Sequence, residues 1–219
     1  NIEQTRKFYA TDEELIEDIA KAYQDVIKQF YAAGCRNLQL DDCTWGAIVG
    51  DVAKQRYQSL GVDIEEVKAR LLKVNNLALE NRPEDMVITS HICRGNYHST
   101  FFTSGPYDSV ADYVFAQEHV DALLLEYDDE RSGGFAPLAK VSPDKKVVLG
   151  LITTKKPELE DKDKVIARIH EAEKYIPLER LCLSPQCGFA SCEIGNKITE
   201  EQQWAKLALV KEIAEEVWK

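Results

Sequence analysis

Apolar residues along the chain form two alternating kinds of segment, which predict a succession of strands and helices. Short runs that are apolar nearly throughout alternate with longer stretches in which apolar residues recur every three or four positions. The first kind is typical of a strand buried on both faces, and the second is typical of an amphipathic helix. The five predicted strands cover residues 37–41, 86–93, 122–126 and 146–152, and a stretch that begins near residue 180.

Capping signals mark the start of two of the predicted helices. Thr11 with Glu14, and Thr199 with Gln202, have the spacing of a capping box, in which each side chain accepts a hydrogen bond from the other residue's backbone. Apolar residues at helical spacing follow both pairs. Three further helices are predicted around residues 64–74, from Asp108 toward Glu118, and over residues 161–175 as far as Pro177.

Strands that are apolar throughout and separated by amphipathic helices predict an α/β fold, with a parallel sheet covered by helices. Five strands are too few for a closed eight-stranded barrel, so two architectures remain open: an open doubly wound sheet, or the later portion of a TIM-type (β/α)8 barrel. No linker or repeat interrupts the sequence, and we expect residues 1–219 to form a single domain. In either architecture, ligands bind at the carboxyl ends of the strands.

Charge and composition exclude several classes of partner. The formal net charge is −11 and no basic stripe is present, which argues against nucleic-acid binding. No apolar run approaches the roughly 20 residues of a membrane-spanning helix, and no secretory signal pattern is visible. The cysteines are spread through a mid-sized chain with an aliphatic core, which favours free thiols in a reducing compartment. We therefore expect a cytoplasmic protein.

Residue types that bind metals stand at the ends of the predicted strands. His91 and Cys93 end the second strand, Glu126 ends the third, and Cys187 follows the fifth. Imidazole, thiolate and carboxylate groups together suit the tetrahedral shell of zinc. Their long separation along the chain differs from the close pairs of a zinc finger, and favours a catalytic site assembled by the fold. The sequence therefore predicts that these four side chains bind Zn2+.

Each of these residues also has a purely structural interpretation. His91 and Cys93 fit a hydrogen-bonded histidine beside a buried thiol, and Cys187 fits an inert loop cysteine. Glu126 follows three leucines, and burial of its charge requires a partner, which a basic side chain such as Arg131 would supply. The metal interpretation is favoured because the four residues taken together complete one zinc shell.

A zinc site with two thiolates and one carboxylate favours a thiol as the incoming ligand. Coordination lowers the pKa of a thiol, so that a nucleophilic thiolate exists at neutral pH. Hydrolytic zinc sites are more often rich in histidine, with an open position for water. The residues thus predict alkyl transfer to a thiol acceptor. Asp41, which ends the first strand, is a candidate to bind the ammonium group of an amino-acid substrate.

Neighbouring residues are expected to have structural roles. Asp42 fits a helix N-cap or an exposed position, and Trp45 is expected to pack against the following loop, although stacking on a substrate also fits. The acidic loop at residues 127–130 is expected to be solvated. Cys43 lies close to the predicted site along the chain, but nothing in the pattern gives it a role. Three other cysteines are expected to pack or to lie free: Cys35, Cys182 and Cys192.

Four short motifs, in chain order, resemble those of one known family. Gln39-Leu-Asp41-Asp42-Cys43 is similar to a Gln-Ile-Asp-Glu-Pro motif, and His91-Ile-Cys93 matches a His-x-Cys motif. Glu126 matches a glutamate that ends the next strand, and Ser184-Pro-Gln-Cys187-Gly188 resembles Asn-Pro-Asp-Cys-Gly. The family is cobalamin-independent methionine synthase, and the resemblance is to its catalytic C-terminal barrel, most closely in its short single-barrel bacterial relatives.

By that resemblance, His91, Cys93, Glu126 and Cys187 would bind the catalytic zinc, and Asp41 would bind the amino group of homocysteine. The implied reaction moves a methyl group from a methylated folate, or another methyl donor, to the thiol of homocysteine and forms methionine. The implied fold is about five βα units from the later portion of a TIM barrel, with the early strands missing from this chain. Such a portion exposes a sheet edge, and a second copy of the chain is a candidate to cover it.

The chain departs from the family pattern in three ways. The Glu-Pro that follows the aspartate is Asp42-Cys43 here, which leaves the role of Asp42 open. The histidine after the penultimate strand has no counterpart, and Lys155 occupies about that position. The early strands, which would supply more of the homocysteine and folate sites, are absent. Two alternatives therefore stay open: a related zinc-dependent barrel that uses another thiol acceptor, and a non-catalytic zinc-binding fragment.

Overall fold

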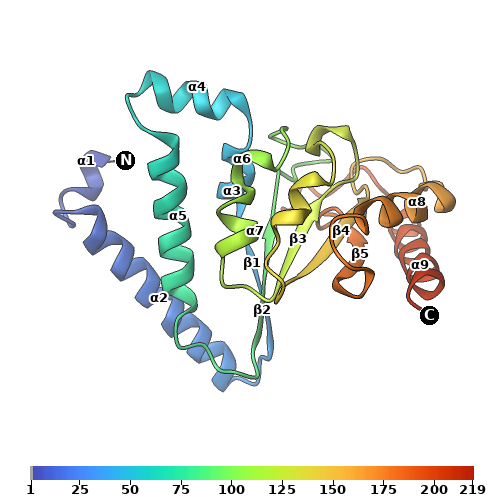
Figure 1. Cartoon of the computed structure of the whole chain (residues 1–219), viewed down its shortest axis with the longest axis horizontal. Helices are drawn as coiled ribbons and strands as arrows, with labels where there is room; N and C mark the ends of the chain where they lie inside the picture. The colour runs from blue at the N-terminus through green and yellow to red at the C-terminus, as the bar shows by residue number, and fades with distance from the viewer. Residues whose placement is uncertain (1) are drawn as a thin grey trace.

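A single sheet of five parallel strands organises the chain. The structure is a computed structural model that describes residues 2–219 (Figure 1). The strands are β1 (Asn37–Asp41), β2 (Val87–Ile92), β3 (Ala122–Glu126), β4 (Lys146–Ile152) and β5 (Leu181–Pro185). Their order in the sheet is their order in the chain, and every neighbouring pair is parallel. The predicted α/β parallel sheet is confirmed.

The sequential strand order decides between the two architectures that the sequence left open. A doubly wound sheet reverses its strand order at a switch point, whereas the wall of a (β/α)8 barrel adds each new strand on the same side. The order β1-β2-β3-β4-β5 has no reversal. The fold is therefore a portion of a TIM-type barrel.

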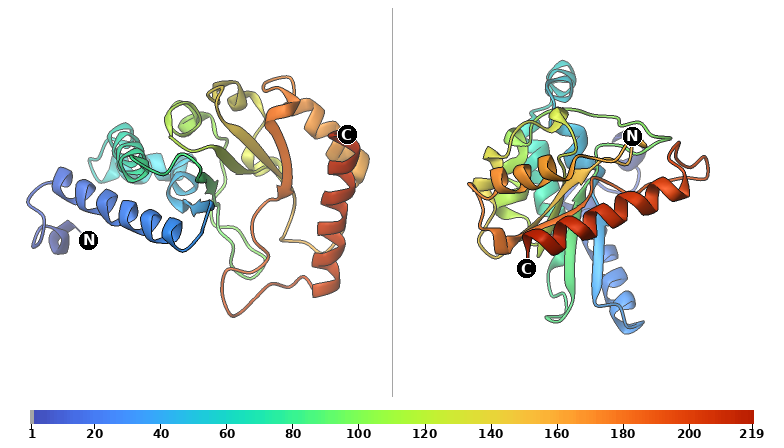
Figure 2. Two further views of the ribbon diagram at one scale, coloured as in Figure 1. Left: turned by 90° about the horizontal axis from the view of Figure 1, so that it is seen from below. Right: turned by 90° about the vertical axis from the view of Figure 1, so that its right-hand side faces the viewer.

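Nine helices are assigned within residues 2–219, most of them between consecutive strands. They are α1 (Ile2–Thr5), α2 (Asp12–Ala32), α3 (Cys43–Ile48), α4 (Asp51–Ser59), α5 (Ile64–Leu79), α6 (Asp108–Ala111), α7 (Val114–Gln117), α8 (Lys162–Ala172) and α9 (Glu200–Val217). Three short 3-10 helices, η1 (Glu130–Ser132), η2 (Ala136–Lys140) and η3 (Leu178–Arg180), complete the connections. In Figures 1 and 2, α2 and α5 lie side by side beyond one edge of the sheet, and α9 lies at the other edge.

The long amphipathic helices begin where their capping signals predicted. Both capping boxes form, at the start of α2 and of α9, and both pairs of reciprocal hydrogen bonds are present. The helix predicted from Asp108 toward Glu118 is wrong in detail: it is the two short helices α6 and α7, and Asp108 lies inside α6 after the N-cap residue Tyr107. The sequence pattern missed α3 and α4, since α3 contains a glycine and α4 has no buried residue.

The sheet core is closed by packed aromatic rings. Tyr107 contacts Phe115 and Tyr127 with ring-centroid distances of 5.5 and 5.2 Å, and Tyr127 contacts Phe135 at 4.7 Å. Trp45 is fully buried and packs in the same core, which confirms its predicted packing role. No helix within residues 2–219 has the length and apolar content that a membrane crossing requires.

Exposed apolar side chains lie on helix α2, which precedes the edge strand β1. The exposed residues of β1 itself are polar, namely Asn37, Gln39 and Asp41. On α2, the side chains of Ile19, Tyr23, Val26 and Phe30 are 39–50% exposed, and they share one helical face.

Helix α3 lies very close to the end of β2. A Cβ atom placed on Gly46 would be 2.1 Å from the carbonyl oxygen of Cys93, which is far inside contact distance. The hydroxyl of Thr103 donates to the carbonyl oxygen of Gly46 at 2.9 Å. Glycine is thus the residue that allows α3 to approach the strand end where the predicted ligands lie.

We predict that Gly46→Ala lowers the free energy of unfolding by about 1–3 kcal/mol, because the added methyl group overlaps backbone atoms. The intrinsic helix preference of alanine, worth about 1 kcal/mol, would by itself give the opposite sign. Gly134→Ala is the matched control, since a Cβ at Gly134 meets no atom within 4 Å. Urea denaturation measures both, and a Gly46→Ala variant as stable as the wild type would contradict the close approach.

Candidate metal centre

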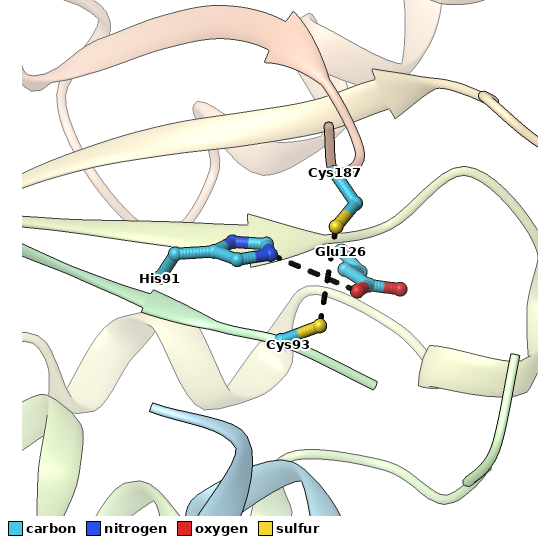
Figure 3. Close-up of side chains that lie close together, drawn as sticks. All are labelled: His91, Cys93, Glu126 and Cys187. Atoms are coloured by element: carbon cyan, nitrogen blue, oxygen red, sulfur yellow. Dashed lines mark hydrogen bonds and ion pairs between the residues drawn. The ribbon is translucent and has the colours of Figure 1, made fainter. Parts of the chain in front are cut away.

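The sheet register brings the carboxyl ends of three strands to one place. Asp41 lies opposite His91, and Glu126 lies opposite Gly150. His91 lies in β2 and Cys93 directly follows it, Glu126 is the last residue of β3, and Cys187 follows β5 by two residues. Figure 3 shows the four predicted ligand side chains pointing toward one another from these strand ends.

The four side chains have the spacing of a metal site. One ligand atom from each of them lies within 4.8 Å of the other three. The Sγ atoms of Cys93 and Cys187 are 3.9 Å apart, and Nε2 of His91 is 3.9 Å from Oε1 of Glu126 (Figure 3). Ligand atoms in a tetrahedral zinc shell are about 3.3–3.8 Å apart, given bond lengths of about 2.0–2.3 Å. A small contraction would therefore fit these atoms around one cation.

The imidazole of His91 is oriented for coordination through Nε2. Its Nδ1 lies 3.3 Å from the carbonyl oxygen of Leu124, which fits an Nδ1–H donor and leaves the lone pair on Nε2. Nε2 is buried and has no hydrogen-bond partner. Such an atom is costly to leave unpaired, and a cation at the cluster would satisfy it. Burial alone would lower the pKa of His91, but the negative groups of Cys93 and Glu126 outweigh it and raise that pKa.

Glu126 is fully buried, and its two oxygens have different partners. Oε2 accepts a hydrogen bond from Nη2 of Arg131 at 2.8 Å, and Oε1 accepts one from the backbone N–H of Arg94 at 2.8 Å. Burial raises the pKa of Glu126, although both donors act against that rise. The arginine partner that the structural interpretation required is therefore present, while Oε1 still faces His91.

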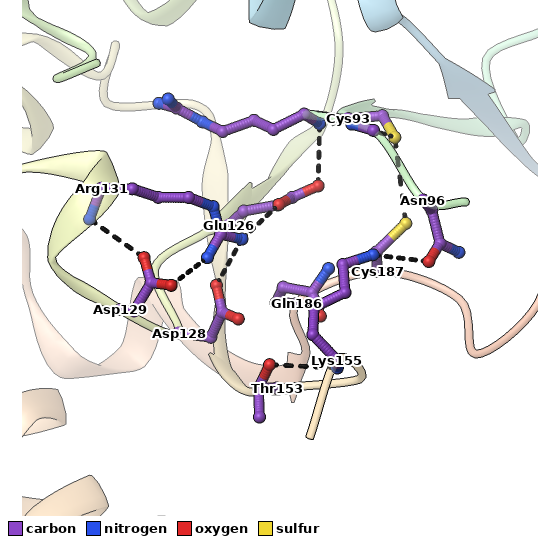
Figure 4. Close-up of polar contacts among 12 residues, drawn as sticks. Cys93, Asn96, Glu126, Asp128, Asp129, Arg131, Thr153, Lys155, Gln186 and Cys187 are labelled. Atoms are coloured by element: carbon purple, nitrogen blue, oxygen red, sulfur yellow. Dashed lines mark hydrogen bonds and ion pairs between the residues drawn. The ribbon is translucent and has the colours of Figure 1, made fainter. Parts of the chain in front are cut away.

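The acidic loop after β3 is solvated only in its second half, and the expectation for residues 127–130 was wrong for Tyr127 and Asp128. Tyr127 is fully buried and the Asp128 side chain is 1% exposed, whereas the Asp129 side chain is partly exposed and Glu130 is exposed. Oδ1 of Asp128 lies 2.7 Å from Nη2 of Arg131, and Arg131 also pairs with Asp129 (Figure 4). A buried carboxylate needs a counter-charge. The burial of Asp128 could therefore have been predicted from Arg131, which follows it by three residues directly after a strand end.

The contact between the two thiols of the cluster shifts their pKa values in opposite directions. The hydrogen bond with Cys187, helped by His91 and by the backbone N–H of Gly95, lowers the pKa of Cys93 to about 4 despite its burial. The same contact raises the pKa of Cys187. A thiolate at Cys93 and a thiol at Cys187 is a pair that a cation can convert to two thiolates.

Asp41 lies beside the cluster, next to Cys93. A carboxylate oxygen of Asp41 and the Sγ atoms of Cys43 and Cys93 all lie within 4.8 Å of one another. Burial, together with the charge of Cys93, raises the pKa of Asp41. Asp42 has the predicted capping role, since its side chain accepts a hydrogen bond from the backbone N–H of Thr44 at the start of α3.

A cavity of about 320 Å³ lies beside this cluster. Its lining residues are Ser99, Thr100, Phe101, Asp128, Asp129, Thr153, Lys155 and Lys156. The ammonium group of Lys155 donates to Oδ1 of Asn96 at 2.5 Å, and Asn96 in turn donates to the carbonyl oxygen of Gly188, close to Cys187 (Figure 4). Burial lowers the pKa of Lys155, although the charges of Cys187 and Glu126 oppose this. The sequence analysis missed Asn96 and Phe101, which belong to no motif.

One wall of the cavity is a strained loop. His98 and Ser99 have positive φ values of 46° and 64°, a conformation that costs side-chain-bearing residues free energy. The Ser99 hydroxyl donates to Asn196 at 2.7 Å and accepts from the backbone N–H of Lys197 at 2.9 Å. The loop after β2 is therefore tied to the loop after β5, and strain of this kind is typical of binding sites.

Known proteins are similar to nearly the whole length of the chain. The family model described as the catalytic domain of cobalamin-independent synthase matches residues 7–216. The uncharacterized protein YxjH of Bacillus subtilis is 51% identical over 212 residues, which are 96% of this chain and 56% of YxjH. The chain thus spans about half the length of this relative.

Two solved structures have a similar fold. A Listeria monocytogenes protein with the provisional name vitamin-B12 independent methionine synthase has a TM-score of 0.76 and 39% identity, over 96% of this chain and 57% of its own. A B12-independent methionine synthase from Shewanella, solved in complex with selenomethionine, has a TM-score of 0.67 at 19% identity, over 96% and 56%. The second likeness concerns the fold alone.

We expect Arg131→Met to lower the free energy of unfolding at neutral pH by about 3–5 kcal/mol, because Glu126 and Asp128 stay buried without their counter-charge. The matched control is Arg56→Met on the exposed helix α4, which should change stability by less than about 0.5 kcal/mol. Urea denaturation compares the two variants. Equal stability of both would mean that Arg131 does not compensate the buried carboxylates.

Proposed function

The chain belongs to the cobalamin-independent methionine synthase family, whose catalytic domain it matches, and from this premise we propose that it catalyses the zinc-dependent transfer of a methyl group to the thiol of homocysteine. The product is methionine, and the methyl donor is a methylated folate or another small methylated molecule. The chain spans about half of its relative YxjH, and the activity is proposed for the site that this portion contains.

The observation that carries the proposal is the convergence of four ligand atoms from three strand ends. His91, Cys93, Glu126 and Cys187 would hold the zinc, and the buried Nε2 of His91 without a partner supports a cation at that point. When bound, zinc lowers the pKa of a substrate thiol enough to give a thiolate at neutral pH. Arg131 holds Oε2 of Glu126, so that Oε1 is the oxygen oriented toward the metal.

The residues around the cluster fit an amino-acid thiol. Asp41 lies next to Cys93, where its carboxylate would bind the ammonium group of homocysteine while the thiol reaches the cluster. The Shewanella relative was solved with selenomethionine, the selenium analogue of the proposed product.

The cavity beside the cluster fits the methyl donor. Phe101 offers an aromatic surface for a flat ring, and Lys156 offers positive charge for an anionic tail. Lys155 lies close to Cys187 and is held by Asn96, so its ammonium group would meet the part of the donor nearest the acceptor thiol. These side chains bind and orient the donor at the edge of the metal cluster.

The zinc ligands are tested by replacing one sulfur. Cys187→Ser should weaken zinc binding by about 100-fold or more. Even the loss of a residue that only hydrogen-bonds to a metal ligand costs about 10–100-fold in affinity. Cys182→Ser in β5 is the control, because this half-buried thiol lies outside the cluster and should leave the zinc content unchanged. Zinc is measured by elemental analysis after gel filtration. A Cys187→Ser variant that keeps wild-type zinc affinity would contradict the ligand set.

The acceptor is tested by calorimetric titration of the zinc-loaded chain with two thiols. Homocysteine should bind, and Asp41→Asn should weaken it by about 10–100-fold through loss of a charged hydrogen bond. The same variant should not weaken 2-mercaptoethanesulfonate, which has no ammonium group, and Asp42→Asn should affect neither thiol.

Three outcomes of this titration would count against the proposal. A preference for 2-mercaptoethanesulfonate would indicate a different thiol acceptor. No thiol binding by a zinc-loaded chain would indicate a non-catalytic zinc-binding portion. Equal effects of Asp41→Asn on both thiols would remove the assigned role of Asp41.

A further inference from the structure

A third thiol lies against the proposed metal ligands. The Sγ atom of Cys43 is within 4.8 Å of the Sγ atom of Cys93, and a carboxylate oxygen of Asp41 completes the group. Cys43 is exposed, whereas Cys93 is buried, and both thiols are free. Cys43 is not one of the four clustered ligands, so this thiol remains available when the metal site is filled.

The backbone around Cys43 and Cys93 suits a covalent link between them. β1 and β2 are paired up to Asp41 and His91, and the next backbone N–H, of Asp42, donates to the carbonyl oxygen of His91 at 2.9 Å. Beyond this point α3 stays close, since Gly46 lies against the Cys93 carbonyl. Each cysteine lies two residues past the last registered pair, and the two Sγ atoms lie within 4.8 Å of each other at this end of the sheet.

We propose that Cys43 and Cys93 form a reversible disulfide when a peroxide reaches the site, and that this bond removes Cys93 from the metal ligands. Zinc binding and thiol activation would then stop until a dithiol reduces the bond. The effect on the metal rests on the proposed function, whereas the disulfide itself requires only the two sulfurs.

The chemistry balances with hydrogen peroxide as the oxidant. The Cys93 sulfur attacks one peroxide oxygen, the O–O bond breaks, and the departing hydroxide takes up a proton to become water. The Cys43 sulfur then attacks the sulfenic sulfur of Cys93, with Asp41 placed to accept the thiol proton. The S–S bond forms, the S–O bond breaks, and the second oxygen also leaves as water. The two sulfurs lose two electrons, which reduce one peroxide.

Cys187 is the competing partner, since its Sγ atom is 3.9 Å from that of Cys93. In the zinc-loaded site, however, Cys187 would itself be a ligand of the cation, so its sulfur would not be free to attack. Cys43 binds no metal and is exposed. It is therefore the free sulfur that can reach an oxidised Cys93.

The test is disulfide mapping in the zinc-loaded chain after treatment with hydrogen peroxide. Trypsin gives one peptide at residues 37–54 and one at residues 74–94, and each contains a single cysteine, Cys43 and Cys93 respectively. We expect these two peptides to be joined with loss of two hydrogens, and to separate after reduction. A colorimetric chelator should detect one zinc released per disulfide formed.

Two variants make the test specific. Cys43→Ser should hold zinc as the wild type does before oxidation, form no such link, and release zinc at least about fivefold more slowly. Cys192→Ser, which removes another exposed thiol, should behave as the wild type.

The outcomes separate this inference from the proposed function. A link between peptides 74–94 and 181–197 in place of the expected one, or wild-type zinc release in Cys43→Ser, would overturn the disulfide. A chain that carries no zinc but forms the Cys43–Cys93 link would support the disulfide and contradict the proposed zinc site. A chain that carries zinc and forms no link would support the proposed zinc site and contradict the disulfide.

Discussion

Burial of the Glu126 carboxylate is the interaction on which the rest of the site depends. A fully buried negative charge is tolerated only with a counter-charge and hydrogen bonds, and Arg131 and the backbone of Arg94 supply them. The backbone N–H of Glu126 also donates to the hydroxyl of the buried Tyr107. Arg131 holds Oε2 of Glu126, and Oε1 lies beside His91, where the sulfurs of Cys93 and Cys187 also lie.

The fold provides this position through the common end of its parallel strands. Residues far apart in the chain meet because β1, β2, β3 and β5 end at one edge, which places Asp41 beside the ligands, and the close approach of α3 adds Cys43 to the same place. Two groups of ligand-type residues share Cys93. One group fits a cation, and the other joins a substrate-binding carboxylate to a thiol that can respond to oxidation. Cys93 therefore links the proposed catalysis to its proposed control.

Much of this arrangement could be predicted from the sequence. Strands β3 and β4 are apolar nearly throughout, which made them visible in the sequence, and the ligand types at the strand ends indicated a shared site before any geometry was known. The helix after Asp108 and the acidic loop could not be read in this way, because both depend on contacts across space. Asp128 is buried only because Arg131 folds back to it, and Asn96 acquires its role only through Lys155 and Gly188.

X-ray absorption at the zinc edge tests the central claim most directly, because it counts the atoms that surround the metal. The account predicts a zinc-loaded chain with two sulfur neighbours at about 2.3 Å and two nitrogen or oxygen neighbours at about 2.0–2.2 Å. A shell of nitrogen and oxygen alone would contradict it, because Cys93 and Cys187 would then not bind the metal. Four sulfur neighbours would contradict it as well, because His91 and Glu126 would be excluded.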